Sequence, residues 1–129
     1  MKTKIKKPII TYHQNGNISY EEYFFNKKLH RIDGPAMISY NENGSKSCES
    51  YFLNGKRHRI AGPAYIWFNI DGSERIVQYY ENGFLHRVDG PAFMQFYPKN
   101  IKSFYLKGKH ISAASDNEFK KIVKFLAFK

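Results

Sequence analysis

Residues 30–36 read His-Arg-Ile-Asp-Gly-Pro-Ala, residues 58–64 read His-Arg-Ile-Ala-Gly-Pro-Ala, and residues 86–92 read His-Arg-Val-Asp-Gly-Pro-Ala. Each copy begins 28 residues after the one before it. A fixed period of this size is typical of repeat architectures, in which each copy is one supersecondary unit packed on its neighbours. We therefore expect the motif residues to belong to the scaffold, and a functional surface to lie where the copies differ.

The residues between the motifs predict β-hairpins. Aligning the chain on the period gives three full units and a shorter fourth that begins at Phe93. Each full unit starts with alternating apolar residues, which is typical of a strand. Asn-Gly or Asp-Gly follows, a dipeptide that favours a tight hairpin turn. A second strand, a second turn and the Gly-Pro-Ala connector complete the unit, and the glycine is expected to adopt a backbone conformation that other residues resist.

The expected core lies on one face of these strands, because side chains two residues apart share a face. Two columns of apolar residues recur at the period and define this face: Ile10, Ile38, Ile66 and Met94, and then Tyr12, Tyr40, Phe68 and Phe96.

The chain departs from the repeat after residue 112. Ser115 and Glu118 have the spacing of a helix capping box. The next apolar residues form one helical stripe: Phe119, Ile122, Val123 and Leu126. The sequence thus predicts an all-β fold of antiparallel hairpins, three full and one degenerate, capped by a C-terminal helix. The expected parts are a basic tail at 1–8, the repeat array at 9–112 and the capping helix at 113–129.

Composition narrows the class of protein. No apolar run approaches the ~20 residues of a membrane-spanning helix, and no signal-peptide core follows the basic N-terminus. The single cysteine, Cys48, excludes an internal disulfide and suggests a reducing compartment, so a cytoplasmic location is expected. We expect its thiol to be buried among apolar neighbours.

The formal net charge of +10 suggests a nucleic-acid ligand, but its distribution along the chain argues against a continuous groove for phosphates. Residues 9–92 carry as many acidic as basic side chains, and the excess lies at the two ends. Basic ends of this kind favour solubility or weak, non-specific attraction. At the N-terminal end the lysines are Lys2, Lys4, Lys6 and Lys7.

Residues 79–92 carry a resemblance to a known family. They read Tyr-Tyr-Glu-Asn-Gly-Phe-Leu-His-Arg-Val-Asp-Gly-Pro-Ala, which resembles the unit of MORN-like β-hairpin repeat proteins of bacteriophages and giant viruses. The likeness covers about residues 9–126; Ala61 replaces the motif Asp, and Lys27 replaces a turn glycine. It implies an interaction module with protein partners, and for related repeats also membrane lipids. A phage origin would favour an inhibitor of a host defence protein that acts in the host cytoplasm.

The motif histidines do not predict a metal or catalytic site. Equivalent positions in neighbouring hairpins lie roughly 10 Å apart, twice the strand spacing, whereas zinc ligands converge at about 2 Å from the ion. We expect the imidazoles to bond backbone groups of their own connectors, and the motif arginines to hold the turn through the motif aspartates. His13 has no explanation in this pattern. No enzyme, cofactor or metal site is predicted, and the structural repeat residues are His30, Arg31, Gly34, His58, Arg59, Gly62, His86, Arg87 and Gly90.

The face opposite the core columns breaks the repeat. Units three and four place four aromatic residues there, expected on adjacent strands, namely Tyr65, Trp67, Phe93 and Tyr97. Such clusters mark protein-binding sites, unless the helix or a folded-over sheet covers that face. A second candidate is a basic set for phosphates or an acidic partner, namely Lys56, Arg57, Arg59, Lys107 and Lys109. A protein partner is the first hypothesis; nucleic-acid binding through basic termini and exposed aromatic residues is the alternative.

Overall fold

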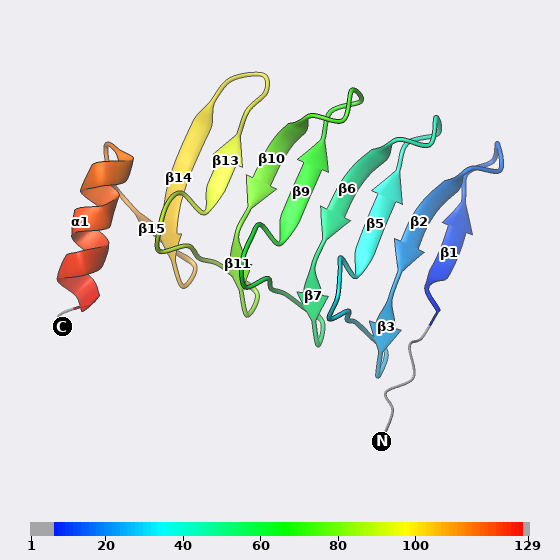
Figure 1. Cartoon of the computed structure of the whole chain (residues 1–129), viewed down its shortest axis with the longest axis horizontal. Helices are drawn as coiled ribbons and strands as arrows, with labels where there is room; N and C mark the ends of the chain where they lie inside the picture. Colours follow the sequence, from blue (N-terminus) through cyan, green and yellow to red (C-terminus); the bar gives the residue numbers. More distant parts are fainter. Residues whose placement is uncertain (1–6, 128–129) are drawn as a thin grey trace.

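Nine strands form one antiparallel sheet in the computed structural model, which describes residues 7–127. Each strand pairs with the next strand of this sheet along the chain, so the sheet is a continuous meander (Figure 1). The predicted all-β fold of antiparallel hairpins with a C-terminal helix is confirmed. The strands, in spatial order, are β1 (Ile9–Tyr12), β2 (Ile18–Glu22), β5 (Met37–Tyr40), β6 (Lys46–Ser50), β9 (Tyr65–Phe68), β10 (Glu74–Gln78), β13 (Phe93–Gln95), β14 (Ile101–Leu106) and β15 (Lys109–Ile111).

The turns of the main hairpins have the geometry that their sequence predicts. Gly16, Gly44 and Gly72 have φ angles of 92°, 91° and 90°, where only glycine is unstrained. The residue before each glycine stabilises the turn with its side chain: the Oδ1 of Asp71, for example, accepts from the backbone N–H of Ser73 at 2.9 Å.

Each full unit also contains a second, short hairpin along one edge of the sheet (Figure 1). Its turn has two consecutive residues with positive φ, such as Asn54 at 51° and Gly55 at 81°, as a type I′ turn requires. The sequence predicts these turns but not the strands beside them, which are two residues long. They are β3 (Phe24–Phe25) with β4 (Lys28–Leu29), β7 (Phe52–Leu53) with β8 (Lys56–Arg57), and β11 (Tyr80–Glu81) with β12 (Phe84–Leu85).

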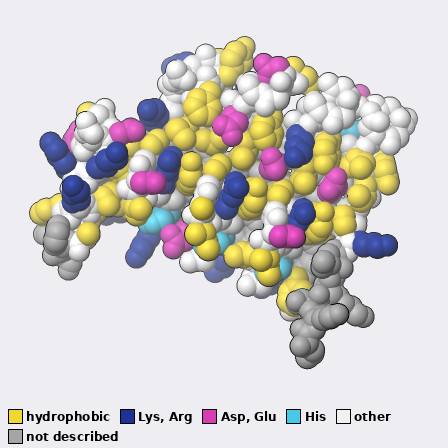
Figure 2. Space-filling model, in the orientation of Figure 1, with side chains coloured by type: hydrophobic (Ala, Val, Ile, Leu, Met, Phe, Trp, Pro, Cys, Tyr) yellow, Lys and Arg dark blue, Asp and Glu magenta, His cyan; other side chains and the backbone are white. Residues whose placement is uncertain are grey.

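The predicted core face is buried only in the central units. Ile38 and Ile66 are 7% and 8% exposed, whereas Tyr12 and Phe96, at the two ends of the array, are 61% and 44% exposed. Apart from α1 at the last strands, no described element forms a second layer over the sheet, and Figure 2 shows one broad face with hydrophobic side chains between charges of both signs. This face is therefore a mixed surface rather than a dry core.

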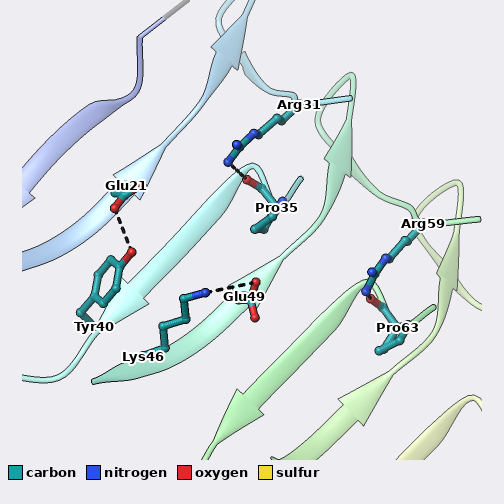
Figure 3. A network of polar contacts seen from close by, with 8 residues as sticks. All are labelled: Glu21, Arg31, Pro35, Tyr40, Lys46, Glu49, Arg59 and Pro63. Atoms are coloured by element: carbon teal, nitrogen blue, oxygen red, sulfur yellow. Dashed lines mark hydrogen bonds and ion pairs between the residues drawn. The ribbon is translucent and has the colours of Figure 1, made fainter. Parts of the chain in front are cut away.

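Acidic side chains lie between the core isoleucines on this face. The strand register places Glu21 opposite Ile10 and Ile38, and Glu49 opposite Ile38 and Ile66. Glu21 accepts a hydrogen bond from the Tyr40 hydroxyl at 2.8 Å (Figure 3). Burial, and next this hydrogen bond, raise the pKa of Tyr40 to about 12.

The helix α1 (Asp116–Ala127) packs against the last strands at the core face. The Ser115 hydroxyl accepts from the Glu118 N–H at 3.1 Å, as the capping sequence predicts. Phe119 is fully buried and stacks on Phe104 with ring centroids 4.5 Å apart. Only the start of the predicted apolar stripe is buried, since Leu126, near the end of the helix, is 46% exposed.

Candidate functional site

The motif histidines join each unit to the next one. Each motif histidine accepts a hydrogen bond at Nδ1 from a backbone N–H group. The donors are Asn54 to His30 at 2.9 Å, Asn82 to His58 at 3.0 Å and Lys107 to His86 at 2.9 Å. The donors belong to the short turn of the following unit and not to the histidine's own connector, so that detail of the sequence prediction is wrong. The physical reason is that the short hairpins pack side by side, which brings that turn onto the imidazole. His13 has a similar role, since its Nε2 lies 2.8 Å from the carbonyl oxygen of Tyr40.

The motif arginines are held by aromatic and polar contacts within their own units. The guanidinium of Arg31 lies 3.9 Å from the ring centroid of Tyr23, and its Nη1 donates to the Pro35 carbonyl at 3.2 Å (Figure 3). The Nε of Arg31 also donates to Asp33 at 3.1 Å, as expected. Arg87 repeats all three contacts, with Tyr79, Pro91 and Asp89.

The motif glycines are required for space rather than for an unusual backbone. A Cβ atom on Gly34 would lie 3.0 Å from the guanidinium carbon of its own unit, and Gly62 and Gly90 have the same neighbour at 3.0 and 3.1 Å. None of the three has a φ in the left-handed region, so the expected conformational role is wrong. The following alanines, Ala64 among them, are completely buried.

The four aromatic residues of the candidate face do not lie on adjacent strands. Strand β10 runs between β9 and β13, and Gln78 lies opposite both Tyr65 and Phe93. The expectation is wrong because each hairpin contributes two strands to the sheet. Tyr65 and Phe93 are half-buried, while Trp67 and Tyr97 are 38% and 57% exposed.

Arg75 connects the two exposed aromatic residues. Its guanidinium lies 4.6 Å from the Trp67 ring centroid and 5.4 Å from that of Tyr97. Sequence reasoning missed Arg75, although a signal was present: the equivalent positions of units one and two hold Ser19 and Ser47. We call Trp67, Arg75 and Tyr97 the aromatic clamp.

The contacts that the structure shows between α1 and the sheet lie away from the aromatic clamp. Phe119 and Asp116 contact Phe104 and Lys102, whose side chains lie on the core face. By strand alternation Trp67 lies on the opposite face, and Arg75, which contacts the Trp67 ring, also contacts the ring of Tyr97.

Beside the aromatic clamp, Cys48 is buried and its pKa is raised chiefly by that burial. The expected burial of the thiol is confirmed, but its neighbours are not all apolar, since a side-chain hydrogen bond with Tyr65 partly offsets the rise in pKa. Burial also raises the pKa of Tyr65, with Cys48 as the next cause, to about 12. Arg57 lies 4.7 Å from the Tyr65 ring centroid, and its buried Nε has no hydrogen-bond partner among the described residues.

The basic candidates lie along the edge that bears the short hairpins. Lys56, Lys107 and Lys109 are exposed there, while Arg57 and Arg59 are half-buried against aromatic rings. Charges separate between the two parts of units one and two, which the net charge of each whole unit conceals. The short hairpins, connectors and final turn, at 24–36, 52–64, 80–92 and 105–111, hold nine basic and three acidic residues. The rest of the described array, up to residue 104, holds four basic and six acidic residues.

Comparisons with known proteins gave no relative: no family model, curated protein or solved structure matches the chain. Within residues 7–127 no helix has the length and apolar character to cross a membrane. The same residues contain no cluster of three or more His, Cys, Asp or Glu side chains suited to a metal ion. The lysines expected to form the basic tail lie outside the described residues, apart from Lys7.

Proposed function

We propose that the chain is a non-catalytic protein-binding module and that the aromatic clamp is its contact surface. The observation that carries this proposal is the pair of exposed rings, Trp67 and Tyr97, with the half-buried Arg75 in contact with both. These three residue types dominate binding energy at protein interfaces. Each ring makes a cation–π contact with Arg75, and these contacts restrain the side chains before a partner arrives. The resemblance to MORN-like repeats of phages supports the same class of function, with a host defence protein as the proposed target.

The test compares Trp67→Ala with Phe96→Ala, a matched change of another exposed aromatic on the opposite face. Tagged protein captures partners from host lysate after nuclease treatment, and circular dichroism verifies folding of each variant. We expect Trp67→Ala to lose a partner that wild type and Phe96→Ala retain. Equal capture by both variants would refute the proposal, and so would unfolding of Trp67→Ala, because a core Trp costs about 3–5 kcal/mol on truncation.

Nucleic-acid binding is the second candidate, and the basic edge favours it. Such binding would rest on phosphate contacts and would fall steeply as salt rises. A salt titration against labelled single-stranded RNA and DNA measures this directly. Tight binding that persists at physiological salt would favour this function over a protein partner, and loss of binding by that salt would leave only non-specific attraction.

A further inference from the structure

The edge of the sheet that bears the short hairpins and the Gly-Pro-Ala connectors, which we call the connector edge, presents a row of exposed aliphatic side chains. The third residue of each His-Arg motif is Ile32, Ile60 or Val88, and these side chains are 84%, 91% and 52% exposed. Aliphatic residues at such exposure contribute little to the core, and they recur on the same edge of the sheet as the excess basic charge. Apolar surface that is bordered by polar groups is typical of a contact site.

Two grooves separate the three connectors. The first, of about 680 Å³, lies between connectors one and two and is lined by Ile32, Tyr51 and Leu53 among others. The second, of about 450 Å³, lies between connectors two and three and includes Tyr79 and Val88 in its lining. Arg59 and Ile60 line both grooves, and so they occupy the ridge at the centre of this edge.

Among the described residues, Arg59 is the only motif arginine whose guanidinium has no carboxylate as an ion-pair partner. Asp33 and Asp89 pair with the Nε atoms of their arginines at 3.1 and 2.8 Å, but unit two has Ala61 at that position. The other two restraints remain, because Arg59 lies 4.0 Å from the Tyr51 ring centroid and its Nη1 donates to the Pro63 carbonyl at 3.0 Å. The Arg59 guanidinium is therefore held by the same ring and carbonyl contacts as those of Arg31 and Arg87, but its Nε has no acidic partner among the described residues.

We infer that Arg59 binds a carboxylate of a partner protein, at the position that Asp33 and Asp89 occupy in the neighbouring units. Aliphatic side chains of the same partner segment then lie in the two grooves, against the exposed residues at the third motif position. Neighbouring connectors are roughly 10 Å apart, so three of them span roughly 20 Å, the length of about six extended residues. The site thus fits a short extended segment with Asp or Glu near its centre and aliphatic residues on both sides.

The charges of the edge favour a single carboxylate over a polyanion. The carboxylates of Asp33 and Asp89 are 83% and 76% exposed, and they lie in the connectors on either side of Arg59. A phosphate backbone that crossed all three connectors would meet both negative charges. The groove tyrosines Tyr51 and Tyr79 already stack on Arg59 and Arg87, and the exposed aliphatic side chains offer bases no stacking surface but suit aliphatic side chains of a peptide. This surface is separate from the aromatic clamp, and so the inference extends beyond the proposed function.

The decisive substitution is Ala61→Asp, which supplies the carboxylate from within the chain. Ala61 is exposed and both neighbouring units carry Asp there, so the variant is expected to fold as stably as wild type. The matched control is Asn100→Asp, which adds the same charge at an exposed position away from the connectors. A second control, Phe96→Ala, removes an exposed aromatic side chain that belongs neither to the connectors nor to the aromatic clamp.

The probe is a displayed library of random peptides about twelve residues long, twice the estimated contact length. Peptides selected on the wild type are labelled, and their dissociation constants are measured by fluorescence anisotropy. We expect selected peptides to share Asp or Glu flanked by aliphatic residues. Ala61→Asp should weaken their binding by at least about tenfold, whereas the two controls stay within about twofold.

Changing the peptide's acid to its amide should weaken binding to wild type but not to Ala61→Asp, which ties the effect to Arg59. The inference fails if selection yields no peptides, if the selected peptides lack an acid, or if Ala61→Asp binds them as wild type does. It also fails if labelled single-stranded RNA binds tightly at physiological salt and Ala61→Asp abolishes that binding, because the ligand would then be a nucleic acid.

Discussion

Replacement of the motif glycine Gly34 by alanine tests whether the motif is organised around its arginine. The added Cβ would lie 3.0 Å from the guanidinium carbon of Arg31. That group cannot simply move away, because the Tyr23 ring, the Pro35 carbonyl and Asp33 hold it. We therefore expect alanine to disturb all three contacts.

The magnitude follows from those contacts. A partly exposed cation–π contact contributes about 0.5–1 kcal/mol and a hydrogen bond about 0.5–1.5 kcal/mol. The ion pair adds about 0–1 kcal/mol because Asp33 is 83% exposed. Alanine offsets about 0.4–1 kcal/mol of this loss by reducing the entropy of the unfolded chain, since the φ of Gly34 lies outside the left-handed region. At the midpoints of these ranges, Gly34→Ala should thus destabilise the protein by about 1.5 kcal/mol.

Urea unfolding, followed by circular dichroism, measures this effect in a double-mutant cycle with Arg31→Ala. Without the guanidinium the clash disappears, and Gly34→Ala should become neutral or stabilising. Gly16→Ala is the control, because Gly16 has a φ of 92° with no atom near its Cβ direction. Its cost should be the same with or without Arg31. A neutral Gly34→Ala in the wild type, or a coupling energy below about 0.5 kcal/mol, would refute the reasoning.

Two further predictions concern the helix and two half-buried tyrosines, Tyr40 and Tyr65. Phe119→Ala should cost about 3–5 kcal/mol and detach α1, which amide hydrogen exchange would detect as lost protection at 116–127 without equal loss in units one and two. Tyr40 ionises near pH 12 in the folded protein because its pKa is raised, so the stability that it contributes is fully present below its usual pKa of about 10 and is lost as pH rises through about 12. A pH titration followed by phenolate absorbance should contain a step near pH 12 from Tyr40 and Tyr65. Tyr40→Phe and Tyr65→Phe, made separately, should each remove one tyrosine from that step, and an unchanged step in either variant would contradict the structure.

Local chemistry explains what could be predicted from the sequence. The turn at Asp71-Gly72 depends on residues next to each other in the chain, and so does the cap at Ser115. The strands follow from alternation over a few residues. These features need no knowledge of which segments meet in space, and the structure confirms them.

The remaining features depend on contacts between distant residues. His30 accepts a hydrogen bond from a turn 24 residues further along the chain, and Arg75 connects Trp67 on β9 with Tyr97, which follows β13. The role of Gly34 is visible only once the Arg31 guanidinium is placed against it. The separation of charge between the sheet and the connector edge is likewise not visible in the net charges of consecutive sequence segments. A repeat pattern predicts which residues are equivalent, but not which atoms meet.

The energetics of the motif explain why a departure from the repeat can change binding without changing the fold. An exposed ion pair contributes about 0–1 kcal/mol, so unit two can lack the motif carboxylate at little cost to its stability. The Tyr51 ring and the Pro63 carbonyl still position Arg59, because neither contact involves Ala61. Loss of one weak stabilising contact therefore leaves a positioned cation at the centre of the connector edge. Among the motif's contacts, the ion pair is the one that the scaffold can lose most easily and that a partner's carboxylate can most directly replace.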